Sequence, residues 1–413
     1  MGRSSFPIIA FLLAVILLAL PILASSGDRN PTFQHCLKGC QLTYCEPHQP
    51  PIPAYLRAFG WTCKENCGYE CAHSFTDNIR PGSKNHQFYG KWAFYRLGPF
   101  QEVFSMLMSL GNLYVNLKGL EQLRRRVRVE NGLRSWLAAM GWIQVNTWVW
   151  STVFHARDTP NTERLDYFSA TLTISFTMLY AIIRIFNLRT PISSSRLLIP
   201  VSASVGFLVL GHFTYLLSFA SGSFPYGYHT KFNLVLAAVH SILWITWTLS
   251  FKYHLPTFSI LGKQFGFPKP YPPNDPLLPG SVKPKEASTP LILVLLTFLA
   301  MGFELLDFAP VFRLIDAHSL WHLATIPLTI AWWHFFIEDV IELEGSMLVG
   351  RGTSPLGVQP NEKSLSGDVI SDQQQLPITP RTPHFAQLAA GTANSKFSRL
   401  ASPGKSPKLD KPE

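Results

Sequence analysis

The chain has 413 residues, of which 47% are hydrophobic, 13% are aromatic and only 15% are charged, and its net charge is +10. Typical soluble domains carry a charge on about 25% of their residues, so this chain is richer in apolar surface than they are. The composition therefore excludes an ordinary soluble globular protein and predicts a membrane protein. Most of the hydrophobic residues fall between residues 98 and 340.

The N-terminus carries an apolar run, Phe6–Leu23, which follows Arg3 and ends in small residues. This pattern predicts a secretory signal peptide over residues 1–26, cleaved near Gly27. The run is long for a signal core, so an uncleaved anchor is the alternative. In both cases the next segment enters the lumen of the secretory pathway.

Residues 27–97 form a Cys-rich segment that holds every cysteine of the chain. They are Cys36, Cys40, Cys45, Cys63, Cys67 and Cys71. Confinement to one lumenal segment predicts disulfides, and six cysteines allow fifteen connectivities that the sequence does not distinguish. A zinc site is the competing interpretation, but the three-residue gaps do not match the usual ligand spacing.

Seven apolar stretches follow, each near the 20 residues or so that a helix needs to cross a membrane. They cover residues 99–117, 133–154, 165–185, 197–220, 232–251, 290–308 and 318–337. The predicted fold class is an all-α integral membrane protein, a seven-helix bundle over residues 98–340. Six crossings is the alternative count.

Basic residues indicate the orientation of these helices, because cytosolic loops are enriched in Lys and Arg. Such residues gather between helices one and two, three and four, and five and six, as in the run Arg124–Arg128. The N-terminus is thus predicted to be lumenal and the C-terminus cytosolic. Residues 341–413 are rich in Ser, Pro, Gly and Gln, which predicts a disordered cytosolic tail.

The positive charge does not indicate nucleic-acid binding. Topology already explains the basic run near Arg124, and basic residues beside a membrane also attract anionic lipids. Membrane lipids are therefore the predicted partners of this surface, and nucleic acid is not.

A set of polar residues lies within the apolar stretches, at one predicted lumenal level. Ser151 and His155 lie at the end of helix two, Asp166 at the start of helix three, and His318 and His322 at the start of helix seven. Ionisable residues in membrane segments are costly and usually functional. Residues four apart project from one helix face. His318 and His322 can therefore bind one metal ion with His155 as a third ligand, which leaves zinc an open position.

These residues resemble the Per1-like family, which remodels the lipid of glycosylphosphatidylinositol (GPI) anchors, within the superfamily of alkaline ceramidases and adiponectin receptors. The resemblance covers most of residues 27–340. Its specific parts are the Cys-rich segment, residues 146–158 with the sequence NTWVWSTVFHARD leading to Asp166, and residues 316–322 with the sequence DAHSLWH.

The resemblance implies that His155, His318 and His322 hold Zn²⁺ beside Ser151 and Asp166. Asp166 would orient or deprotonate the attacking water, and Ser151 would donate a hydrogen bond to the developing oxyanion. A rival mechanism makes Ser151 the nucleophile.

The implied activity is that of a GPI-specific phospholipase A2-like hydrolase, which cuts the sn-2 acyl ester of the anchor's phosphatidylinositol to give lyso-GPI. GPI-anchored proteins would carry the substrate, in the endoplasmic reticulum membrane or alternatively the Golgi. A seven-helix receptor, a membrane chaperone or metal-homeostasis factor, and a ceramidase-like amidase are the other hypotheses.

Several polar residues outside this set have less specific expectations. His212 and His240 are expected to pack or to line a substrate cavity. Asp158 is a second acid or a solvated loop residue. Glu304 and Asp307 are expected to pair with Arg313 or to line the site.

Overall fold

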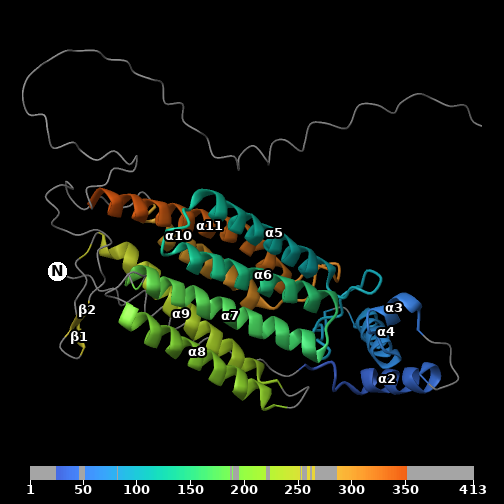
Figure 1. The fold of residues 1–413 in the computed structure, drawn as a ribbon. Helices are drawn as coiled ribbons and strands as arrows, with labels where there is room; N and C mark the ends of the chain where they lie inside the picture. The colour runs from blue at the N-terminus through green and yellow to red at the C-terminus, as the bar shows by residue number, and fades with distance from the viewer. Residues whose placement is uncertain are drawn as a thin grey trace, which may run out of the picture. The chain divides into compact units, whose positions relative to one another are not determined.

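The computed structural model describes residues 25–45, 52–80, 82–186, 188, 195–219, 224–251, 253, 258–260, 263–265 and 286–350. Most of the predicted signal peptide and all residues after Gly350 lie outside these ranges, as does most of the Pro-rich connection before residue 286. The fold is mostly helical (Figure 1).

The Cys-rich segment contains three helices: α2 (Pro31–Tyr44), α3 (Ala54–Ala58) and α4 (Cys63–Asp77). Local sequence explains where two of them begin. Asn30 accepts a hydrogen bond from the Thr32 amide at the start of α2, and Thr62 with Glu65 forms a capping box at the start of α4.

Three disulfides join α2 and the residue that follows it to α4, which runs antiparallel to α2. The pairs are Cys36 with Cys71, Cys40 with Cys67, and Cys45 with Cys63. The predicted disulfides are confirmed, and no free cysteine is found in the described residues, so a zinc site on these sulfur atoms is wrong. Phe33 and Phe88 pack against the bridges as a small buried core.

Each of the seven predicted crossings corresponds to a helix in the described part of the chain. These are α5 (Val103–Arg126), α6 (Arg134–Ala156), α7 (Pro160–Ile185), α8 (Ser195–Leu217), α9 (Tyr226–Ser250), α10 (Thr289–Leu306) and α11 (Ala317–Gly350). Some extend beyond the apolar stretch that predicted them. The helix α7 begins at Pro160, where Thr159 supplies a cap, and α11 continues past residue 340, where we predicted the start of the tail.

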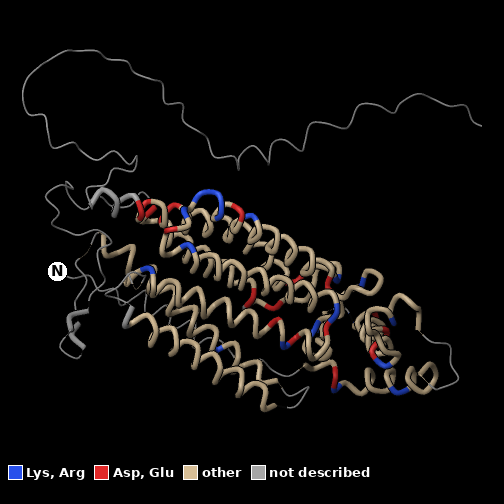
Figure 2. Tube along the Cα trace, viewed as in Figure 1, with Lys and Arg blue, Asp and Glu red and all other residues tan. Residues whose placement is uncertain are grey.

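Four of these helices, α7, α8, α9 and α11, are long and apolar enough to cross a membrane, which fits a multi-pass membrane protein. Figure 2 shows long stretches of α8 and α9 without charged residues. The count of seven crossings, which adds α5, α6 and α10, stays a prediction.

The helix α5 is less apolar because it turns a polar face inward. Ser105, Ser109, Asn112 and Asn116 are buried, whereas Leu107 and other apolar residues of the helix are exposed. This arrangement is the reverse of a soluble amphipathic helix and suits a helix whose outer face meets lipid.

The helix α5 packs between α6 and α11, with α7 beside α6 and α10 beside α11, while α9 contacts both α7 and α10 (Figure 1). Two glycines permit a close approach to α11. A Cβ atom at Gly119 would lie 2.3 Å from the Trp333 ring, and one at Gly141 would lie 2.8 Å from the same ring. The Trp333 indole also donates to Oδ1 of Asn116 at 2.9 Å.

A small two-stranded antiparallel hairpin lies between α9 and α10 in the chain, within an otherwise helical fold. Strand β1 (Phe258–Ile260) pairs with β2 (Lys263–Phe265), with Ile260 opposite Lys263. The sequence around the hairpin is Pro-rich, and strands of three residues are too short to give a period-two pattern.

Candidate metal centre

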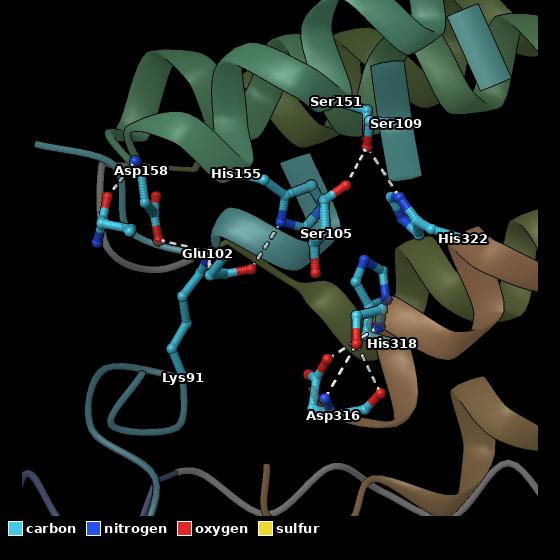
Figure 3. A network of polar contacts seen from close by, with 12 residues as sticks. Lys91, Glu102, Ser105, Ser109, Ser151, His155, Asp158, Asp316, His318 and His322 are labelled. Atoms are coloured by element: carbon cyan, nitrogen blue, oxygen red, sulfur yellow. Dashed lines mark hydrogen bonds and ion pairs between the residues drawn. The ribbon is translucent and has the colours of Figure 1, made fainter. Parts of the chain in front are cut away.

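Three histidines from two helices converge at one end of the bundle. His155 lies in the last turn of α6, and His318 and His322 lie one turn apart at the start of α11. One ring nitrogen of each lies within 4.8 Å of those of the other two. The ring centroids of His155 are 5.2 Å from His318 and 5.0 Å from His322 (Figure 3). The structure therefore brings together the three histidines that the sequence singled out as metal ligands.

Each of these imidazoles has a hydrogen-bond partner on Nδ1. His155 Nδ1 lies 2.6 Å from Glu102, His318 Nδ1 lies 2.6 Å from Glu304, and His322 Nδ1 lies 2.9 Å from Ser109. An acceptor on Nδ1 fixes the tautomer in which Nε2 has a free lone pair, as in most protein metal sites. The Nε2 atom of His155 is buried and has no hydrogen-bond partner in the described part of the chain. The donor set therefore fits a zinc ion bound through three Nε2 atoms.

Ser151 belongs to a chain of hydroxyl groups beside His322. Its Oγ lies 3.0 Å from Oγ of Ser109, which donates to the carbonyl oxygen of Ser105 at 2.8 Å. If His322 donates from Nδ1 to Ser109, the hydroxyl of Ser151 must also donate to Ser109. Ser151 would then have to rotate its hydroxyl before donating to another acceptor.

Asp166 is the fifth residue of the predicted set, and it is partly buried on α7. Its carboxylate interacts electrostatically with His318 and Lys91 but makes no hydrogen bond among the described residues. It is also outside the group of three histidines whose ring nitrogens lie close enough together to hold one metal ion. Thr147 of α6 donates to the carbonyl oxygen of Ser169 at 2.8 Å, and this contact fixes α7 against α6 near Asp166.

The start of α11 is fixed by Asp316 and Ser319. The Ser319 amide donates to Oδ1 of Asp316 at 2.9 Å, and the Asp316 amide donates to Oγ of Ser319 at 3.0 Å. This reciprocal cap satisfies backbone groups at the helix start. It sets the position of His318, which lies between the two residues.

A partly buried ion pair lies next to His155, and the sequence did not indicate it. Lys91, from the Cys-rich segment, pairs with Glu102 and lies 3.2 Å from Oδ2 of Asp158 (Figure 3). Burial alone would lower the pKa of Lys91, but the carboxylates of Asp158 and Glu102 raise it above its usual value. Asp158, expected to be a second acid or a solvated loop residue, is thus an ion-pair partner of Lys91.

The remaining predicted candidates lie in other contacts. Glu304 lines the site through His318, whereas Asp307 accepts hydrogen bonds from Gln87 and Trp92. Arg313 pairs with Asp77 instead of either acid.

The two isolated histidines pack within the bundle as expected. His212 lies 3.2 Å from His229. His240 lines a small cavity of about 100 Å³ together with Trp332 and accepts a hydrogen bond from Trp244.

Glu102, Ser109 and Lys91 are the site residues that the sequence reasoning missed. A signal existed for Ser109, because polar residues repeat on one face of α5 within an apolar stretch. Glu102 resembled an ordinary acid at a helix start. Lys91 stands in a polar loop with no pattern around it.

Comparison with known proteins decides the family of this chain. Residues 53–340 match the model of the Per1-like family. The chain belongs to the Per1-like family.

Its relatives match over most of their length. The GPI-specific phospholipase A2-like PGAP3 of Danio rerio is 32% identical over 80% of this chain and 95% of its own. The PER1 homolog of Schizosaccharomyces pombe is 31% identical over 80% of this chain and 92% of its own. PGAP3 of Homo sapiens is 30% identical over 77% of this chain and 90% of its own. No solved structure gives a significant match.

Proposed function

We propose that this member of the Per1-like family removes the sn-2 acyl chain from the phosphatidylinositol of GPI anchors in a metal-dependent hydrolysis. One observation carries the proposal: three converging histidines have their Nδ1 atoms occupied, and His155 keeps a buried, unpartnered Nε2. The names of the vertebrate relatives, which describe GPI-specific phospholipase A2-like proteins, supply the substrate class.

His155, His318 and His322 would hold the metal, for which zinc is the proposed identity because it accepts three imidazoles and keeps an open position. When bound, such an ion polarises an ester carbonyl and lowers the pKa of water. Glu102, Glu304 and Ser109 keep the three rings in place through Nδ1.

Asp166 and Ser151 would act on the substrate itself. Asp166 accepts a proton from the attacking water while the water oxygen bonds to the carbonyl carbon of the ester. Asp166 then gives this proton to the sn-2 oxygen of the glycerol as the bond between that oxygen and the acyl carbon breaks. Ser151 donates a hydrogen bond to the carbonyl oxygen as charge develops there. The products are a free fatty acid and lyso-GPI.

The position of the histidines suits a substrate whose glycan lies in the lumen. They lie at the ends of α6 and α11 that adjoin the Cys-rich segment, whereas Arg124, Arg125 and Arg126 end α5 at its other terminus. The proposed orientation therefore has the N-terminus lumenal and the C-terminus cytosolic, in the endoplasmic reticulum membrane. Tagged protein that co-localises with Golgi markers instead would change the compartment.

Purified wild-type protein and the variants His155→Ala and His334→Ala test this function. Metal content and release of lyso-GPI from a GPI substrate are measured on all three. His334 serves as the control because it lies on α11 but contacts Glu338, away from the three histidines. We expect His155→Ala to lose both metal and product, and His334→Ala to keep both.

Two outcomes would contradict the proposal. Lyso-GPI production by His155→Ala at the wild-type rate would favour a receptor or chaperone role for the bundle. Release of fatty acid from ceramide but not from GPI would favour an amidase.

A further inference from the structure

We propose that Lys91 of the Cys-rich segment is a positioning residue for the metal ligand His155 and acts on it through Glu102. The inference rests on the proposed metal-dependent function. It adds a residue from outside the helical bundle to the site.

The two carboxylate oxygens of Glu102 are divided between Lys91 and His155. Oε1 pairs with the Lys91 ammonium, and Oε2 lies 2.6 Å from Nδ1 of His155 (Figure 3). The side chain of Glu102 is only 7% exposed, so solvent offers little alternative to these two partners. The orientation of the carboxylate, and with it that of the imidazole, depends on both contacts.

Lys91 is itself held from several sides. Oδ2 of Asp158 lies 3.2 Å from its ammonium nitrogen, and the ring centroid of Phe154 lies 3.9 Å from the same atom. A lysine on a flexible exposed stem would be a weak constraint. Here the Lys91 ammonium contacts two carboxylates, those of Glu102 and Asp158, and the face of the Phe154 ring, so its position is well defined.

Removal of the ammonium would leave the buried Glu102 carboxylate with the neutral His155 imidazole as its hydrogen-bond partner and without the cation that now balances its charge. A buried charge that loses its partner is strongly unfavourable, so the carboxylate would move or take up water. Metal sites depend on ligand positions held within about 0.5 Å by supporting residues. We therefore expect His155 to lose its alignment with His318 and His322.

The backbone of Lys91 is fixed to the disulfide core. Phe88 and Lys91 exchange two backbone hydrogen bonds, at 2.7 and 3.0 Å. Phe88 is buried against Phe33 and against Cys67 and Cys71, which belong to two different disulfides. The Cys-rich segment thereby acts as part of the scaffold of the metal site.

Full-length protein in detergent, titrated with Co²⁺ as the probe, tests the inference. Co²⁺ reports both affinity and ligand geometry through its visible absorption bands. The variants are Lys91→Met, Lys91→Gln and Lys91→Arg. The matched control is Arg96→Met, which removes another partly buried cation of the same segment, one that contacts Asn66 and Glu70 but none of the three histidines.

We expect Lys91→Met to weaken Co²⁺ binding about 10-fold or more, the range seen when groups behind metal ligands are replaced, and to change the absorption bands. Lys91→Gln covers the case in which the Met variant does not fold, and we expect it to weaken Co²⁺ binding as well. Lys91→Arg, which keeps the positive charge, should retain the wild-type Co²⁺ affinity and absorption spectrum. Arg96→Met should also match wild type in both.

Three results would overturn the inference. Wild-type affinity and spectrum in Lys91→Met or Lys91→Gln would remove Lys91 from the site while the proposed hydrolysis stands. An equal loss in Arg96→Met would assign the effect to the stability of the Cys-rich segment. A wild-type protein that binds no Co²⁺ would remove the metal centre itself, and the role of Lys91 with it.

Discussion

Oε2 of Glu102 lies 2.6 Å from Nδ1 of His155, while Nε2 of the same ring is buried without a partner among the described residues. Oε2 of Glu304 lies at the same distance, 2.6 Å, from Nδ1 of His318. A carboxylate behind an imidazole orients the ring and makes it a better metal ligand. Two carboxylates, one at the residue before α5 and one on α10, therefore support one candidate metal centre.

Replacement of either carboxylate should weaken metal binding. We expect Glu102→Gln and Glu304→Gln each to lower Zn²⁺ affinity by about 10- to 100-fold, because a neutral amide holds the imidazole less strongly. Competition with a zinc chelator measures the change. Glu121→Gln is the control, since Glu121 pairs with Lys118 near the opposite end of α5. Equal affinities for all three variants would contradict a supporting role for the carboxylates.

Ser109 connects His322 to Ser151, so its loss should affect both. Ser109→Ala leaves two buried polar atoms without their partner, which costs about 1–3 kcal/mol for each group that stays unsatisfied. We expect a lower midpoint of thermal unfolding and a lower metal content than in wild type. Ser204→Ala should change neither, because Ser204 is exposed on α8 and bonds only to its own helix. A Ser109→Ala protein as stable as Ser204→Ala would show that the hydroxyl chain is dispensable.

The helices and the three histidines could be predicted from the sequence because both leave a local signal. Apolar length marks a helix in a membrane, and His318 with His322 shows the four-residue spacing of one helix face. The hairpin of β1 and β2 left no such signal in its Pro-rich surroundings. The disulfide partners, for example Cys45 with Cys63, could not be predicted, because only the packing of α2 against the α4 region selects them.

The supporting residues could not be predicted because their contacts are set by tertiary structure. Glu102 contacts a residue 53 positions away, and Ser109 contacts one 213 positions away. Asp166 was singled out in the sequence as a polar residue at the same predicted lumenal level as the histidines, and the role that the family resemblance implies for it stays a prediction. The inward polar face of α5 shows that, in a membrane bundle, polar periodicity marks the interior.

The contact of Trp333 with α5 and α6 predicts that Gly119 cannot be enlarged. Gly119→Ala would place a methyl group 2.3 Å from the indole ring, and overpacking of this kind costs about 1–3 kcal/mol. We expect the midpoint of thermal unfolding of the purified protein to fall. Gly206→Ala on α8, where a Cβ atom meets nothing within 4 Å, should leave it unchanged or raise it slightly. A Gly119→Ala protein with wild-type stability would mean that α5 and α11 can separate without cost.

His73 predicts that the stability of the Cys-rich segment falls in acid. Its Nε2 lies 2.9 Å from the carbonyl oxygen of Phe94, and its Nδ1 lies 2.9 Å from Nη1 of Arg313, so the ring donates through Nε2 and accepts through Nδ1. This arrangement requires a neutral imidazole. Burial, and then the guanidinium of Arg313, lower the pKa of His73 from its usual value near 6.5.

The sign of the pH dependence follows from this lowered pKa. Below about pH 6.5 the unfolded chain binds a proton at His73 that the folded protein excludes, so unfolding becomes more favourable as the pH falls toward the folded-state pKa. Above that range both states are neutral and the contribution of His73 to stability is fully present. We expect the unfolding midpoint of wild type to fall more steeply between pH 7 and pH 5 than that of His73→Gln, whose amide can donate and accept but does not titrate. Parallel profiles for the two proteins, measured by thermal unfolding with the disulfides intact, would show that the pKa of His73 is the same in the folded and unfolded states and would contradict the prediction.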